Sequence, residues 1–262
     1  MQERHINRSL YFDEQVKTTT KYVVPYIEQV MAITEQTRIL EVGCGEGGNM
    51  VPFLQKGAYG LGIDLHTTKI ANGVKIMQEQ YPTAKVDFIC QDIYTVELAD
   101  TGQFDLIILR DVIEHLHNQE RFMTYVKKFL RPNGKIFFGF PPWRMPFGGH
   151  QQVSNTKLSK VPFIHLLPSG LYAKVLRWFG ENETTIAALL EIKDTGISIG
   201  RFESIVQKEQ YQYDAKTLYF INPNYEIKFG LTPRRVWAPF TWIPFFKDFY
   251  TTCYYCIISQ NK

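Results

Sequence analysis

The sequence lacks long apolar runs: no stretch approaches the roughly 18 residues needed to cross a bilayer. Its first residues also lack the apolar core that follows a basic start in a signal peptide. The 29 Lys and Arg and 26 Asp and Glu residues are interspersed, and their net charge of +3 forms no basic stripe typical of a dedicated nucleic-acid binder. We therefore expect a cytoplasmic protein with no transmembrane segment and no clear nucleic-acid site.

Cysteine is scarce, with four residues in 262. Cys44, Cys90, Cys253 and Cys256 lie in or beside predicted strands, as small buried thiols do in a reducing compartment. Cys253 and Cys256 form a C-x-x-C pair, but residues three apart on a strand face opposite sides of a sheet. No second Cys or His pair completes a zinc site, so we expect no metal.

Glycine, by contrast, is concentrated at one place. Residues 38–48 read R-I-L-E-V-G-C-G-E-G-G, and a second apolar run then leads to Asp64. Glycine at 43 and 45 permits a sharp turn with positive φ and lets a ligand approach the backbone closely. An acid at the end of the next strand can accept hydrogen bonds from ribose hydroxyls. The pattern predicts an adenosine-containing ligand.

The glycines alone do not identify that ligand, because Gly43, Gly45 and Gly48 also satisfy the dinucleotide pattern G-x-G-x-x-G. Two carboxylates argue against a dinucleotide: Glu41 lies just before the loop and Glu46 lies inside it. Both would repel a diphosphate and would favour a ligand with positive charge, such as S-adenosylmethionine. A nicotinamide-dependent oxidoreductase remains one alternative, although it lacks a recognisable catalytic domain here. A cofactor-binding protein without catalytic activity is another.

The order of motifs resembles the class I S-adenosylmethionine-dependent methyltransferases, and within them the small-molecule and ubiquinone-biosynthesis branch. The acid-x-G-x-G-x-G motif of that family matches Glu41, Gly43, Gly45 and Gly47. Further along, F-D-L-I-I-L runs into R-D-V-I-E-H-L-H-N, and R-P-N-G-K precedes I-F-F-G-F, so the match spans roughly residues 38 to 140. The resemblance implies methyl transfer from S-adenosyl-L-methionine to a small molecule or biosynthetic intermediate, with O-methylation favoured.

The resemblance also implies a set of cofactor-binding residues. Asp64 would bind the ribose, Asp92 with Ile93 would meet the adenine edge, and Arg110 would close the pocket from strand four through its backbone. The full set is Glu41, Gly43, Cys44, Gly45, Gly47, Asp64, Leu65, Asp92, Ile93 and Arg110.

Transfer to a hydroxyl requires a base, and histidine suits that role near neutral pH. His150, in G-G-H-Q-Q after strand five, is the candidate general base. His115 is expected to give structural support, and His165, between apolar neighbours, to be a satisfied core or cap residue. The F-P-P-W segment at 140–143 resembles the D/N-P-P-Y/F motif of amino-methyltransferases, but Phe140 cannot accept hydrogen bonds from an amine.

Apolar runs separated by short loops and helical stretches predict a doubly wound parallel sheet of the α/β class. The resemblance implies a single Rossmann-like methyltransferase domain over 1–262, with a mostly parallel seven-stranded sheet whose last strand is antiparallel. Helical spacing precedes it in the N-terminal segment 1–36, with Pro25 as a kink or helix start. The predicted strands are 38–42, 59–64, 86–91, 104–109, 134–140, 211–220 and 251–259.

Two segments do not belong to the minimal sheet and are insertions: 141–195 after strand five, and 221–249 between strands six and seven. We expect both at the carboxyl edge, where ligands bind in open α/β folds, and there they would form a substrate cap. A stabilising cap or a homodimer contact is the alternative. The aromatic residues and prolines of 221–249 also suit contact with a membrane surface or a lipid tail.

Overall fold

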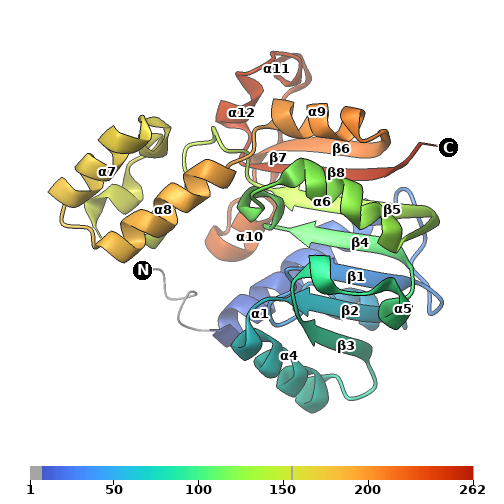
Figure 1. The fold of residues 1–262 in the computed structure, drawn as a ribbon. Helices are drawn as coiled ribbons and strands as arrows, with labels where there is room; N and C mark the ends of the chain where they lie inside the picture. The colour runs from blue at the N-terminus through green and yellow to red at the C-terminus, as the bar shows by residue number, and fades with distance from the viewer. Residues whose placement is uncertain (1–7, 155, 262) are drawn as a thin grey trace.

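The computed structural model describes residues 8–154 and 156–261, and Figure 1 shows their arrangement as helices around a twisted sheet. The predicted N-terminal segment is helical from Arg8 onward, and its first seven residues lie outside the described part. Among the described helices, none has both the length and the apolar character needed to cross a membrane.

One mixed sheet forms the centre of the molecule. Its strands run in the order β3-β2-β1-β4-β5-β8-β6-β7, with β1 to β5 parallel and β8 antiparallel to both β5 and β6. The bounds are β1 Arg38–Val42, β2 Tyr59–Asp64, β3 Lys85–Cys90, β4 Phe104–Arg110, β5 Leu130–Phe140, β6 Tyr211–Ile221, β7 Arg234–Arg235 and β8 Cys253–Gln260.

The predicted strands all form, and the last one is antiparallel as expected. The predicted number of seven is one too low for the described residues, because β7 adds a short strand at the edge beside β6. Two arginines carry no alternating or apolar pattern, so β7 forms through backbone pairing that the sequence does not indicate.

Helices cover both faces of the sheet (Figure 1). The α-helices are α1 Arg8–Thr18, α2 Val24–Ile27, α3 Val51–Leu54, α4 Thr67–Gln80, α5 Leu98–Thr101, α6 Gln119–Val126, α7 Ser169–Trp178, α8 Glu183–Thr195, α9 Ile199–Lys208, α10 Asn224–Phe229, α11 Ala238–Thr241 and α12 Lys247–Tyr250. A π-helical turn at Thr19–Val23 joins α1 to α2, where Pro25 lies in the first turn. The chain therefore begins a new helical segment near the predicted proline.

Strand β8 is buried on both faces of the sheet, and each face has its own core. Cys256 packs with residues of α6 and α9 on one face, whereas Cys253 packs with residues of α2 on the other. The two thiols of the C-x-x-C pair thus lie in different cores, as strand geometry predicts, and all four cysteines are unbonded to one another. The pair is part of the core.

The first insertion forms a helical lobe that stands away from the sheet, coloured yellow to orange in Figure 1. Helices α7 and α8 pack there, joined to β5 by short 3-10 turns at Gln151–Val153, Lys157–Lys160 and Ile164–Leu166. The lobe has its own buried cluster: Leu158, Ile164, Tyr172, Ala173, Leu176, Ile186 and Leu189. Because these residues pack mainly on one another, the lobe is an independent layer rather than an extension of the sheet.

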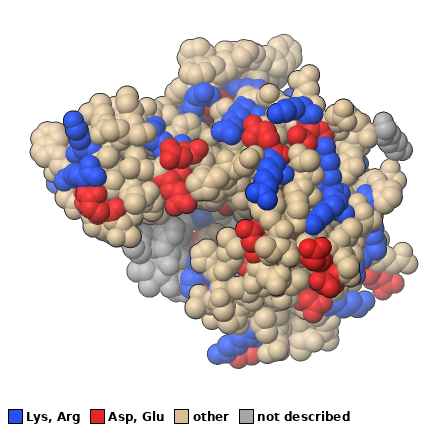
Figure 2. Space-filling model, viewed as in Figure 1, with Lys and Arg blue, Asp and Glu red and all other residues tan. Residues whose placement is uncertain are grey.

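The second insertion divides into two parts. Its first part, α10, packs on α1 and on the π-helical turn that follows: Lys21 Nζ lies 2.8 Å from Glu226 Oε2, and Thr18 Oγ1 lies 3.2 Å from Asn224 Oδ1. Its second part contains α11 and α12, and large aromatic side chains in α11 and between the two helices are exposed, among them Trp242 with 80% of its surface exposed. On the face shown in Figure 2, basic and acidic side chains lie beside one another, without a stripe of one sign.

Candidate functional site

The glycine turn after β1 has the predicted backbone. Gly43, Gly45 and Gly47 all have positive φ, at 70°, 56° and 83°. A Cβ on Gly43 would lie 2.6 Å from Val112 Cγ2, so this glycine is required for packing. A Cβ on Gly45 would meet no heavy atom closer than Lys69 Cδ at 3.9 Å, so this side of the turn is open to a ligand.

Asp64 lies at the end of β2 and fixes the turn. Its Oδ2 accepts a 2.8 Å hydrogen bond from the Gly45 N–H, and its Oδ1 accepts one of 2.9 Å from the His66 N–H. Burial alone raises the pKa of Asp64, but these backbone hydrogen bonds outweigh it and hold that pKa below its ordinary value. The His66 ring Nδ1 also lies 2.9 Å from Oδ1. An ionised carboxylate has about four acceptor sites, so about one remains for a ribose hydroxyl while the exposed His66 ring stays in place.

Glu41, at the end of β1, is 1% exposed. Asn49 Nδ2 donates a 2.7 Å hydrogen bond to its Oε1, and within the described part of the chain Oε2 has no partner. Burial raises the pKa of Glu41 to about 8, although the hydrogen bond from Asn49 opposes that shift. A cationic group beside this carboxylate would favour its charged form.

Arg110 joins the same network through its side chain. Its Nη1 donates to Asn49 Oδ1 at 2.6 Å and to Thr19 Oγ1 at 3.1 Å. Only the Arg110 backbone was expected at the pocket, and no role was expected for Asn49. Asn49 follows the glycines directly, but its partners come from β1, from β4 and from the π-helical turn, where Thr19 Oγ1 donates a 3.0 Å hydrogen bond to its Oδ1. Only the folded chain therefore identifies its role.

Helix α1 lies over the glycine turn. Arg8 Nε donates a 2.7 Å hydrogen bond to Glu46 Oε1, and a Cβ on Gly48 would lie 3.0 Å from the Phe12 carbonyl oxygen. The prediction that Glu46 would repel a diphosphate is therefore wrong, because Arg8 neutralises its charge.

The remaining predicted residues lie along the carboxyl edge but differ in what they expose. Leu65 is 66% exposed beside Asp64, whereas Ile93 and Cys44 are buried in the core, so only their backbones can face a ligand. The Asp92 side chain is exposed and accepts a 3.0 Å hydrogen bond from the Tyr94 N–H as the cap of a 3-10 turn at Ile93–Thr95.

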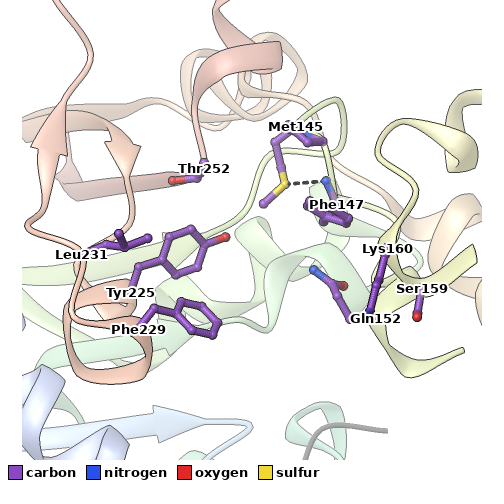
Figure 3. A pocket seen from close by; sticks show the side chains of 10 residues that line it. Met145, Phe147, Gln152, Ser159, Lys160, Tyr225, Phe229, Leu231 and Thr252 are labelled. Carbon is purple, nitrogen blue, oxygen red and sulfur yellow. Dashed lines mark hydrogen bonds between the residues drawn. The ribbon is translucent and has the colours of Figure 1, made fainter. Parts of the chain in front are cut away.

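Two adjoining cavities, of about 440 and 350 Å³, lie where the two insertions meet. Figure 3 shows the larger one, in which the rings of Tyr225 and Phe229 on α10 face the segment that carries Met145, Phe147 and Gln152. The residues that line both cavities are Met145, Phe147, Gln152, Tyr225, Phe229 and Thr252. Residues from both insertions thus form one composite surface with an aromatic wall.

The smaller cavity extends toward the glycine turn. Tyr11 of α1, Asp111 after β4 and His115 in the next turn line it, together with His150 after β5. Val112, which packs on Gly43, lies in the same turn as Asp111. The glycine turn and the cavity therefore share a wall, as a cofactor site and an acceptor site must if a group is to pass between them.

His150 is held in this wall by glycines. It has a left-handed backbone, with φ of 52°, and a Cβ on the preceding Gly149 would lie 2.2 Å from His165 Cβ. His165 is fully buried, and its Nε2 lies 2.8 Å from the Trp143 carbonyl oxygen. His165 is thus a core residue, as predicted, but it is not fully satisfied, because its buried Nδ1 has no hydrogen-bond partner among the described residues. Its ring supports the loop that presents His150.

Glu114 lies in the R-D-V-I-E-H-L-H-N segment after β4, where the sequence by itself assigns it no role. Its carboxylate, His115 and His150 each offer one ligand atom, and these three atoms lie within 4.8 Å of one another. The two imidazole rings contact edge to face, with centroids 5.0 Å apart. The available signal was a Glu-His pair after β4 and a His after β5, because adjacent parallel strands bring their carboxyl ends together.

Comparisons with known proteins agree with this geometry. Residues 40–138 match the family model described as a methyltransferase domain. A ubiquinone biosynthesis O-methyltransferase from Rhizobium johnstonii is 30% identical over 168 residues, 63% of this chain and 64% of that protein. One of the same name from Coxiella burnetii is 28% identical over 58% of this chain and 62% of its own length. The chain thus aligns with less than two thirds of these relatives.

Solved structures share the fold over nearly the whole chain. Magnesium protoporphyrin IX methyltransferase from Synechocystis, crystallised with bound S-adenosylhomocysteine, superposes with a TM-score of 0.57 at 12% identity, over 96% of this chain and 84% of that one. A S-adenosylmethionine-dependent methyltransferase from Clostridium acetobutylicum gives 0.59 at 11% identity, over 94% and 92%. Residues 40–138 thus match a methyltransferase domain, and the chain shares the fold of solved S-adenosylmethionine-dependent methyltransferases, in agreement with the motif order.

Proposed function

We propose that this protein transfers a methyl group from S-adenosyl-L-methionine to a hydroxyl oxygen of a small molecule. The observation that carries the proposal is the shared wall: Gly43 of the glycine turn packs on Val112, next to Asp111, which lines the cavity at His150. The relatives named as O-methyltransferases support oxygen as the acceptor atom.

The residues around the turn fit this cofactor. Asp64 has acceptor capacity for a ribose hydroxyl, and Glu41 offers a buried carboxylate oxygen toward a cationic ligand. Gly43, Cys44, Gly45 and Gly47 would contribute backbone, and Leu65, Asp92 and Ile93 would bound the adenine. When bound, the cofactor supplies an electrophilic methyl carbon, and the protein has to position the acceptor opposite the sulfur and exclude water.

The acceptor would lie in the two adjoining cavities, with the two insertions as its cap. Tyr225, Phe229 and Phe147 offer ring surfaces for a flat, apolar part of the molecule. The hydroxyl would then point toward Glu114, His115 and His150, where its proton has to leave before the oxygen attacks.

Labelled methyl transfer tests this function. Purified protein is incubated with S-adenosylmethionine carrying a labelled methyl group and with pairs of aromatic acceptors that differ only in a hydroxyl or an amino group. We expect label in the hydroxylated member of at least one pair and formation of an equal amount of S-adenosylhomocysteine. Label only in amines would contradict O-methylation, and bound cofactor without transfer to any acceptor would favour a non-catalytic binding protein.

A further inference from the structure

The cluster of Glu114, His115 and His150 has the composition of a cation site. Two imidazoles, which are borderline ligands, beside one hard carboxylate suit first-row divalent transition metals better than Mg²⁺ or Ca²⁺. Their ligand atoms lie within 4.8 Å of one another. Neighbouring ligands around a bound cation lie roughly 3–3.5 Å apart for bonds of about 2.0–2.2 Å, so small side-chain rotations would close the site.

Glu114 provides a second, independent observation. Its side chain is 3% exposed, and neither carboxylate oxygen has a hydrogen-bond partner in residues 8–154 or 156–261. A buried carboxylate without partners is costly. Burial, reinforced by the negative charge of Asp111, raises the pKa of Glu114 well above its ordinary value. A cation at the imidazoles would supply the missing partner and reverse that penalty.

The elements around the cluster hold it ready for a ligand. Glu114 and His115 lie in one 3-10 turn, Ile113–His115, directly after β4. The two glycines before His150 pack so closely on Trp143 and His165 that a Cβ on either of them would clash. Both histidines line the 350 Å³ cavity, whereas Glu114 lies behind them in the core. A cation bound here would therefore keep its open side toward the cavity.

We propose that Glu114, His115 and His150 bind a divalent first-row transition-metal cation at the wall of the acceptor cavity. Its catalytic role rests on the proposed function. The acceptor oxygen coordinates the cation and loses its proton to water, as the cation lowers the pKa of a bound hydroxyl. The oxygen lone pair then forms a bond to the methyl carbon while the carbon–sulfur bond breaks, and that electron pair stays on sulfur. His150 is accordingly a ligand rather than the general base.

Calorimetric titration of chelator-treated protein with Mn²⁺ tests the site. Mn²⁺ is the main probe because the exposed thiol of Cys90 attracts softer metals such as Zn²⁺. We expect one cation bound per chain, and weaker binding of Mg²⁺. Glu114→Gln and His150→Asn should each weaken Mn²⁺ binding by at least about tenfold. Asparagine tolerates the left-handed backbone of residue 150, so His150→Asn removes the imidazole without adding backbone strain.

His117→Ala is the matched control, because His117 is 69% exposed and lies 3.4 Å from Glu191 outside the cluster. It should leave Mn²⁺ binding unchanged. The inference is overturned if wild type binds no stoichiometric Mn²⁺, or if all three variants bind it equally. A parallel titration of wild type with S-adenosylmethionine separates the two proposals. Binding of the cofactor without binding of Mn²⁺ would refute only the cation site. No binding of the cofactor would refute the proposed function.

Discussion

At the residue scale, Glu41 makes a pH-dependent contribution to stability whose sign follows from its burial. Its pKa is about 8 in the folded chain against 4.5 ordinarily, so the unfolded chain loses this proton first as the pH rises. The contribution is therefore full below pH 4.5 and is lost between there and pH 8, at up to about 1.4 kcal/mol per pH unit. Glu41→Gln should remove that loss.

Urea unfolding of ligand-free protein at several pH values from 5 to 8 measures this effect. The free energy of unfolding of Glu41→Gln, relative to wild type, should increase with pH in that range. Glu35→Gln, which changes an exposed carboxylate, should track wild type. Parallel curves for wild type and Glu41→Gln would show that Glu41 does not change its protonation between the folded and unfolded chain in this range.

Asp64 gives the second residue-scale prediction. Asp64→Ala should weaken S-adenosylmethionine binding by roughly 1–3 kcal/mol, because it removes charge-assisted hydrogen bonds and leaves the Gly45 and His66 N–H groups without their acceptor. Calorimetry on both proteins gives the affinities. Asp87→Ala, on an exposed β3 side chain, should change little, and equal affinity of Asp64→Ala and wild type would refute the ribose assignment.

Residues whose role depends on local backbone were predictable, and those whose role depends on distant partners were not. The positive φ of Gly43 and Gly45 follows from a strand-to-helix turn that the sequence already indicates. Asn49 and Arg8, by contrast, acquire their roles from partners on other elements, such as Arg110 and Glu46. Glu114 needed the juxtaposition of two loops before its carboxylate met His150.

At the element scale, the loop after β5 depends on Gly149. Gly149→Ala places a methyl group 2.2 Å from His165 Cβ, so the loop has to move, and we expect a destabilisation of about 1–3 kcal/mol. Cofactor affinity should stay close to that of wild type, since the glycine turn lies elsewhere. Denaturant unfolding and cofactor titration of the same samples measure both effects.

Gly170→Ala is the matched control in α7. A Cβ at position 170 meets no heavy atom within 4 Å, so alanine should stabilise this helix by about 0.4–1 kcal/mol. If both alanine variants change the free energy of unfolding alike, the contact between Gly149 and His165 does not fix the loop.

Elements were predictable where their burial leaves a pattern of apolar residues within their own stretch of sequence. The parallel strands are covered on both faces, so β1, β2 and β4 are continuous apolar runs that the sequence shows directly. The arrangement of the 141–195 segment depends on packing between α7 and α8, and the edge strand β7 on pairing with β6. Neither leaves a periodic signal.

At the scale of the whole molecule, the cavity joins parts of the chain that are far apart in sequence. The first insertion contributes Met145 and Phe147, and α10 contributes Tyr225 and Phe229, so neither insertion alone forms the aromatic wall. The exposed aromatic residues in and after α11 line neither cavity. Within 221–249, only the part around α10 would therefore contribute to the proposed substrate cap.

The most direct test is calorimetric titration of ligand-free protein with S-adenosylmethionine, S-adenosylhomocysteine and NADH in parallel. Our account predicts micromolar binding of the first two and none of NADH. At a hundredfold excess over its dissociation constant, S-adenosylhomocysteine should also raise the free energy of unfolding by about 2.7 kcal/mol. Binding of NADH alone would contradict the account and assign the glycine turn to a nicotinamide cofactor.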